Sequence, residues 1–118
     1  MKKRILVVDD ERNIRTTLTL SLRSEEVDVD CVVSGEEALE RLVMYPYDLV
    51  LLDLRLPGMS GLELIEKLKE LDVASKIVVI SAHGTIDIAV KMLKAGALDF
   101  IEKPFAPDDI RHIVNRYI

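Results

Sequence analysis

Polar side chains follow three short apolar runs and one mixed segment of the sequence, and their types suit the chemistry of a phosphoryl group. Asp9 and Asp10 come after the first run, Asp53 after the second, Ser81 after the third and Lys103 after the mixed segment. Three carboxylates close together repel one another unless a cation or protons neutralise them, and such an all-oxygen cluster suits Mg²⁺. A lysine ammonium and a serine hydroxyl can hold an anionic oxygen opposite a metal. A carboxylate can itself be the nucleophile of phosphoryl transfer, and Asp53 is our candidate.

Each of these residues also has a simpler interpretation. Asp9 or Asp10 could cap a helix that follows, and Asp53 could be an ordinary Asx-turn residue before the Leu56-Pro57-Gly58 sequence. Ser81 and Lys103 mean little by themselves. We favour a shared site because all five residues are expected at the ends of neighbouring strands.

The elements that must position these residues alternate between strand and helix. Residues 5–8, 49–52 and 77–80 are too short for helices and rich in β-branched residues, which indicates strands buried on both faces. Two mixed segments, 29–33 and 98–102, are typical of edge strands. Apolar residues at helical spacing follow each strand, in the ranges 14–22, 38–43, 62–68, 86–93 and 110–117.

Five β-α units predict an α/β fold with a parallel sheet and right-handed crossovers. Edge positions for the second and fifth strands leave the order 2-1-3-4-5, the flavodoxin-like doubly wound arrangement. In such a sheet, ligands bind outside the carboxyl ends of the strands, between strands one and three. Asp9, Asp10 and Asp53 are expected at this point.

The size and composition of the chain exclude several classes of function. At 118 residues there is room for one domain, and a net charge of −5 argues against direct nucleic-acid binding. Residues 1–4 are basic and residues 5–8 are apolar, as at the start of a signal peptide, but acidic residues at 9–11 make the apolar run too short for one. No apolar stretch of the sequence is long enough to span a bilayer. The single Cys31 excludes an internal disulfide and suits a reducing, cytoplasmic setting.

Four segments together resemble the receiver domains of bacterial two-component response regulators, across essentially the whole chain. They are I-L-V-V-D-D-E at 5–11, D-L-V-L-L-D-L-R-L-P-G-M-S-G at 48–61, V-V-I-S-A-H-G at 78–84 and A-G-A-L-D-F-I-E-K-P-F at 95–105. The resemblance implies that Asp53 accepts a phosphoryl group from the phosphohistidine of a sensor histidine kinase. Such a domain is a phosphoacceptor that assists its own phosphorylation and dephosphorylation, and is not classed as an enzyme.

The resemblance also implies roles for the other site residues. Asp10, Asp53 and the backbone carbonyl of Arg55 would bind Mg²⁺, with Mn²⁺ as a substitute, and Asp9 would act through a coordinated water. Ser81 would donate a hydrogen bond to the phosphoryl group. Lys103 would form an ion pair with it, and the Lys103–Pro104 peptide bond would be cis.

A switch is implied as well, in which Ser81 moves toward the phosphoryl oxygen and Phe100 turns inward. The output would then be carried by the face of the fourth helix, fifth strand and fifth helix. The simpler alternative is that Phe100 is only packed. His83 could tune the lifetime of the phosphate, although we favour a solvated loop histidine. Three other residues are given structural roles only: Met44 and Met59 are expected to pack, and Cys31 is expected to be a small core residue.

Three other functions compete with this reading. A nucleotide- or flavin-binding enzyme would need glycines after the first strand, where this chain has Asp9-Asp10-Glu11. A phosphatase with an aspartyl nucleophile would need a D-x-D motif there. An interaction module of the same fold, switched without phosphate, remains the more serious alternative.

The downstream output is inferred only by similarity. Residues 84–105 are similar to receivers of nitrogen-regulatory, enhancer-binding activators, which carry an ATPase and a DNA-binding domain. Neither fits within 118 residues, so we expect residues 1–118 to be the N-terminal receiver of a longer transcription regulator, capable of phosphorylation-dependent homodimerisation. The alternative is a stand-alone receiver.

Overall fold

The computed structural model describes residues 2–82 and 86–118, and it confirms the predicted α/β fold. Five parallel strands form one sheet in the order β2-β1-β3-β4-β5. The strands are β1 (Lys3–Val8), β2 (Val27–Val32), β3 (Leu49–Asp53), β4 (Ile77–Ser81) and β5 (Asp99–Glu102). The helices are α1 (Arg12–Leu22), α2 (Gly35–Met44), α3 (Gly61–Glu70), α4 (Ile86–Ala95) and α5 (Pro107–Tyr117).

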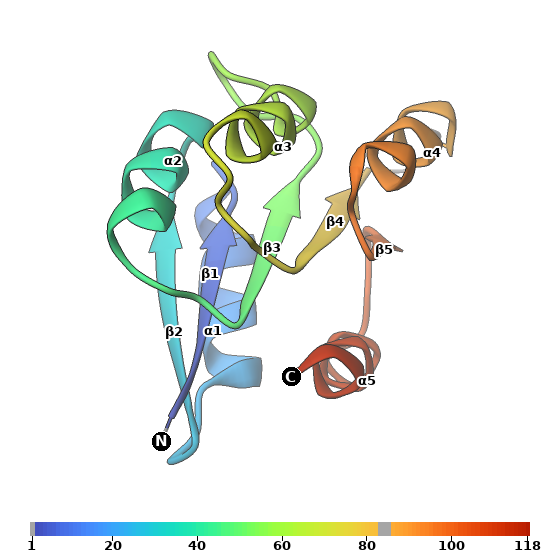
Figure 1. The fold of residues 1–118 in the computed structure, drawn as a ribbon. Coiled ribbons are helices and arrows are strands. Elements are labelled where there is room, and N and C mark those ends of the chain that lie inside the picture. The colour runs from blue at the N-terminus through green and yellow to red at the C-terminus, as the bar shows by residue number, and fades with distance from the viewer. Residues whose placement is uncertain (1, 83–85) are drawn as a thin grey trace.

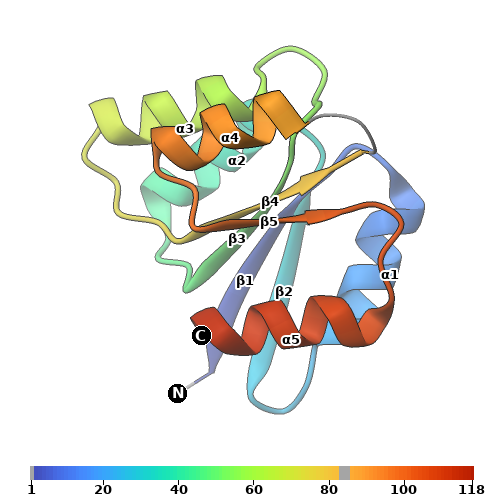
Figure 2. The ribbon, with the colours of Figure 1, turned by 90° about the vertical axis from the view of Figure 1, so that its right-hand side faces the viewer.

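The helices cover both faces of the sheet. Helices α2, α3 and α4 lie on one face, and α1 and α5 lie on the other (Figures 1 and 2). Because successive residues of a strand point to opposite faces, β1 contributes Leu6 and Val8 to the first core and Ile5 and Val7 to the second. Strand β3 is likewise buried along its whole length. Burial on both faces explains why the central strands are continuous apolar runs.

Local signals in the sequence fix where two of the helices begin. Ser34 caps α2 by accepting a hydrogen bond from the N–H of Glu37 (3.2 Å), and Ser60 caps α3 by accepting one from the N–H of Glu63 (3.1 Å). The Glu63 carboxylate accepts in turn from the N–H of Ser60 (3.4 Å), which completes a capping box. Helix α3 therefore starts directly after the loop that follows β3.

Several sequence predictions need correction or completion. Met44 does not pack, because it is 71% exposed at the end of α2. Cys31 is half-buried and packs at the margin of the second core, with its Sγ 3.3 Å from Thr19 Oγ1. Met59 does pack against the core. His83 lies outside the described residues, and among those residues no helix is long and apolar enough to cross a membrane.

Candidate functional site

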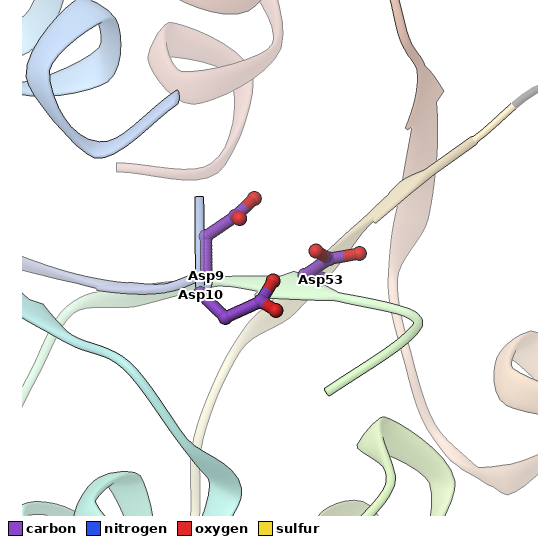
Figure 3. A group of neighbouring side chains, drawn as sticks. All are labelled: Asp9, Asp10 and Asp53. Carbon is purple, nitrogen blue, oxygen red and sulfur yellow. The ribbon is translucent and has the colours of Figure 1, made fainter. Parts of the chain in front are cut away.

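The sheet topology brings the predicted acidic residues together. Asp9 and Asp10 follow β1, and Asp53 is the last residue of β3, the neighbouring strand (Figure 3). Each residue offers one carboxylate oxygen, and these three oxygens all lie within 4.8 Å of one another. Asp9 is fully buried and Asp53 is 5% exposed, whereas Asp10 is exposed. Two of the three carboxyl groups are thus removed from water.

Lys103 connects the acids from the loop after β5. Its Nζ lies 3.2 Å from Asp9 Oδ2, 3.3 Å from Asp53 Oδ2 and 3.4 Å from Glu11 Oε1. Its side chain is only 14% exposed. The backbone N–H of Lys103 donates to the carbonyl of Ser81 (2.7 Å), which ties this loop to the end of β4, and the Lys103–Pro104 peptide bond is cis. One ammonium therefore faces three carboxylates.

The backbone around Asp53 orients its carboxylate. The N–H of Arg55 donates to Asp53 Oδ1 (3.2 Å), so Asp53 does form the Asx turn that was the simpler interpretation. That turn leaves Asp53 Oδ2 for Lys103. The N–H of Leu54 continues the sheet by donating to the carbonyl of Ile80 (2.9 Å). The Asx turn and the shared acidic site are therefore compatible.

Asp9 does not cap α1. Its Oδ1 accepts from the N–H of Glu11 (2.9 Å), and the helix has no side-chain cap at its N-terminus. Its Oδ2 is buried and, within the described part of the chain, accepts no hydrogen bond of good geometry beside its ion pair with Lys103. A buried carboxylate oxygen that lacks a hydrogen bond is costly, so this atom is suited to a cation or a bridging water.

Burial and mutual repulsion perturb the protonation of the site. Burial, followed by the charge of Asp9, raises the pKa of Asp53 to about 6, although the Arg55 N–H and Lys103 oppose the change. Burial alone would lower the pKa of Lys103, but the carboxylates of Asp53 and Asp9 outweigh it and raise that pKa. At neutral pH the cluster therefore holds more negative charge than its one lysine neutralises.

The remaining predicted residues lie near this cluster or on the adjacent strand. Ser81 is 2% exposed at the end of β4, and Phe100 is half-buried in β5 against the core beneath α2, α3 and α4. Two contacts were not predicted from the sequence. Glu11 reaches Lys103, and Arg15 donates from Nη1 to the backbone carbonyl of Asp9 (2.9 Å).

The arrangement suits the binding of a divalent cation and an anionic oxygen side by side. Carboxylate oxygens are the ligands that Mg²⁺ prefers, and the excess negative charge around the buried Asp9 oxygen fits such an ion. Lys103 provides the fixed positive charge that an incoming phosphoryl oxygen would need. Asp53, like Asp9, contacts Lys103 and lies among the metal-ligating candidates.

Comparisons with known proteins agree on one family. A family model described as response regulator receiver domain matches residues 5–115. The chain is 37% identical over 113 residues to the response regulator protein PilR of Pseudomonas aeruginosa, covering 96% of this chain and 25% of PilR. It is 34% identical over 118 residues to sporulation initiation phosphotransferase F of Bacillus subtilis, covering 100% of this chain and 95% of that protein. The chain therefore spans a quarter of the length of one relative and nearly all of the other.

Solved structures give the same result. The structure of NtrX from Brucella abortus superimposes with a TM-score of 0.90 at 36% identity, covering 99% of this chain and 27% of that chain. A CheY-like response regulator receiver domain protein from Methanospirillum hungatei gives a TM-score of 0.90 at 31% identity, covering 98% of this chain and 93% of that one.

Proposed function

Because the chain belongs to the response regulator receiver domain family of two-component systems, we propose that it is switched by transfer of a phosphoryl group from a sensor histidine kinase to Asp53. One observation carries the proposal. The Asp53 carboxylate is buried at the sheet edge, contacts Lys103, and lies within 4.8 Å of oxygens of Asp9 and Asp10. This arrangement supports a carboxylate nucleophile with an ammonium on one side and candidate metal ligands on the other.

The transfer proposed for Asp53 is an in-line displacement at phosphorus. A carboxylate oxygen of Asp53 forms the new P–O bond while the P–N bond to the kinase histidine breaks, and the imidazole nitrogen leaves with the bonding electrons. Lys103 stabilises the negative charge on the phosphoryl oxygens. The hydroxyl of Ser81, at the end of the adjacent strand, donates a hydrogen bond to the same group.

Asp10, Asp53 and the backbone carbonyl of Arg55 would hold Mg²⁺, or Mn²⁺ in its place, and Asp9 would act through a metal-bound water. When bound, the ion supplies positive charge that neutralises the carboxylates and the phosphoryl oxygens. The buried Asp9 Oδ2, whose one partner within the described residues is the ammonium of Lys103, supports this assignment. Without the ion, Lys103 is the one cation among the described residues that opposes the three carboxylates of the cluster and that of Glu11.

The output proposed here passes through Ser81 and Phe100 to the face formed by α4, β5 and α5. Three exposed apolar side chains lie on or beside α4 and β5, and they support a contact surface: Ile88, Val90 and Leu98. PilR is about four times as long as the matched region, so we propose that residues 1–118 are the N-terminal receiver of a longer regulator that controls transcription in the cytoplasm. ATPase and DNA-binding modules and a phosphorylation-dependent homodimer belong to the same proposal.

The experiment that tests this function uses a small phosphodonor in place of the kinase. We would incubate the chain with acetyl phosphate, with Mg²⁺ or with EDTA, and measure the intact mass of the wild type, Asp53→Asn and the control Asp28→Asn. We expect one added phosphoryl group on the wild type and the control, only with Mg²⁺, and none on Asp53→Asn. Equal labelling of Asp53→Asn would contradict the site, and absence of labelling throughout would favour an interaction module switched without phosphate.

A further inference from the structure

The first turn of α2 contacts the loop that follows the proposed phosphoacceptor. This loop, residues 54–60, connects Asp53 at the end of β3 to the first residue of α3. Glu36 reaches across from α2, and its carboxylate accepts a hydrogen bond from the N–H of Met59. The Met59 nitrogen lies 3.3 Å from Oε1 and 3.4 Å from Oε2. The contact joins residues 23 positions apart, so it depends on the fold and not on local sequence.

Two glycines allow this close approach. Gly58 has a φ of +70°, and a Cβ at that position would lie 2.5 Å from Glu36 Oε2. A Cβ at Gly35 would lie 3.1 Å from both the Cβ and the carbonyl oxygen of Met59. The start of α2 and the tip of the loop are therefore fitted to each other at the backbone level, and the Glu36 carboxylate fills the space that Gly58 leaves.

The same loop is bonded to Asp53 at its start and returns close to it at its end. At the start, the N–H of Arg55 donates to Asp53 Oδ1 (3.2 Å). Directly after the loop, Gly61 begins α3 so close to β3 that a Cβ on it would lie 3.0 Å from the backbone oxygen of Asp53. Three residues, 56–58, separate Arg55 from Met59, which Glu36 holds. A displacement of the tip is thus transmitted to the segment that carries the Arg55 carbonyl.

We propose that Glu36 is a positioning residue for the metal site. It holds the tip of the loop through Met59 and so keeps Asp53 and the Arg55 carbonyl in the arrangement that binds the cation. This inference rests on the proposed function. A site that is formed for only a fraction of the time binds its ligand more weakly by that fraction, so loosening the loop lowers the affinity for Mg²⁺ without removing any ligand.

A purely helical role for Glu36 makes different predictions. An acid in the first turn of a helix also stabilises it through the helix dipole, but that effect depends on charge and not on a hydrogen bond to the loop. Glutamine keeps a carbonyl oxygen that can accept from Met59, while alanine does not. Glu40 is an exposed acid on the same helix, and its loss serves as the matched control for charge.

The test is the affinity of the whole 118-residue chain for Mg²⁺, measured by calorimetry, together with urea unfolding in EDTA. We expect Glu36→Ala to weaken Mg²⁺ binding by about three- to tenfold, the range for loss of one typical hydrogen bond. Glu36→Gln should remain within about twofold of the wild type, and Glu40→Ala should match it. In EDTA, Glu36→Ala should have a somewhat lower urea midpoint than Glu40→Ala, because it loses both the bond to Met59 and an acid of the first helical turn.

Two results would overturn the inference. In the first, Glu36→Ala binds Mg²⁺ as tightly as the wild type does. In the second, Glu36→Gln binds Mg²⁺ as weakly as Glu36→Ala does, which would show that the charge of Glu36 matters and not its hydrogen bond. Both are distinct from a failure of the proposed function, in which the wild type itself would bind no Mg²⁺ and accept no phosphoryl group. Gly58→Ala gives a second measurement, because its added methyl group displaces the Glu36 carboxylate. It should weaken Mg²⁺ binding less in the Glu36→Ala background than in the wild type, and equal losses would contradict the coupling.

Discussion

Replacing Asp53 with asparagine should stabilise the metal-free domain, although it removes the proposed phosphoacceptor. Burial, with the charge of Asp9 added, raises the pKa of Asp53 to about 6 from an ordinary value of 3.8. In the unfolded chain the carboxyl group loses its proton near pH 3.8, whereas in the folded chain it keeps the proton until about pH 6. Ionisation of Asp53 therefore destabilises the fold increasingly as the pH rises from about 4 to 6, and by a constant amount above.

The size of the effect follows from the difference between the two pKa values. At about 1.36 kcal/mol for each unit of pKa, a pKa of about 6 in place of 3.8 corresponds to roughly 3 kcal/mol. The asparagine amide carries no charge and has nearly the same shape. We expect Asp53→Asn to gain about 2 to 3 kcal/mol of unfolding free energy at pH 7.5, which raises the Tm by about 10 °C in a domain of this size. Below about pH 4 the gain should disappear.

The assay is urea unfolding in EDTA from pH 4 to 8, followed by circular dichroism because the chain has no tryptophan. Asp28→Asn is the matched control, since Asp28 is a half-exposed carboxylate whose ion pair with Lys2 (3.2 Å) contributes little. The reasoning is refuted if Asp53→Asn is no more stable than the wild type at pH 7.5, or if its gain persists unchanged at pH 4. Added Mg²⁺ should stabilise the wild type and leave Asp53→Asn nearly unaffected.

Three further predictions concern the other charged contacts. Lys103→Met should leave the fold intact but lower its unfolding free energy by about 1 to 3 kcal/mol in EDTA at pH 7.5, because two buried carboxylates lose their cation. Carboxyl NMR should then show the pKa of Asp53 above its wild-type value, and an unchanged titration would contradict the contact. Asp10→Asn should weaken Mg²⁺ binding at least tenfold by calorimetry, and a loss no larger than that of Asp28→Asn would remove Asp10 from the metal site. Tyr47→Phe should lower the unfolding free energy in urea by about 1 kcal/mol, because the Tyr47 hydroxyl donates to Asp30 (2.6 Å); no change would mean that water replaces this bond without loss.

The central strands were predictable because burial on both faces leaves a continuous apolar run. The ends were less predictable, since pairing between strands decides them. Strand β1 begins at Lys3, two residues before its apolar run, because the N–H of Lys3 bonds to the carbonyl of Glu26 and Lys3 pairs with Val27. Strand β2 ends at Val32, so Val33 is 42% exposed where the chain turns toward the α2 cap. Met44 shows that an apolar residue type does not by itself predict burial, because an apolar side chain at a helix end need not face the core.

The site was predictable to the extent that the topology determines it. Parallel strands end at one edge, so Asp9, Asp10 and Asp53 had to meet once the strand order was known. The contacts of Lys103 with particular oxygens, and of Glu36 with Met59, come from loops whose paths depend on tertiary packing. No local pattern in the sequence specifies such contacts. The roles of Ser81 and Phe100 in a switch stay predictions, since they require two states of the molecule to be compared.

The most direct test of the account is to identify the residue that carries the phosphoryl group. After reaction with acetyl phosphate, borohydride would reduce the acyl phosphate to an alcohol and so mark the modified aspartate permanently, and peptide mass spectrometry would locate it. We predict homoserine at position 53, formed with Mg²⁺ and absent with EDTA. A mark on Asp9 or Asp10 instead, or equal marking of Asp53 in EDTA, would contradict the proposal that Asp53 is the metal-dependent phosphoacceptor.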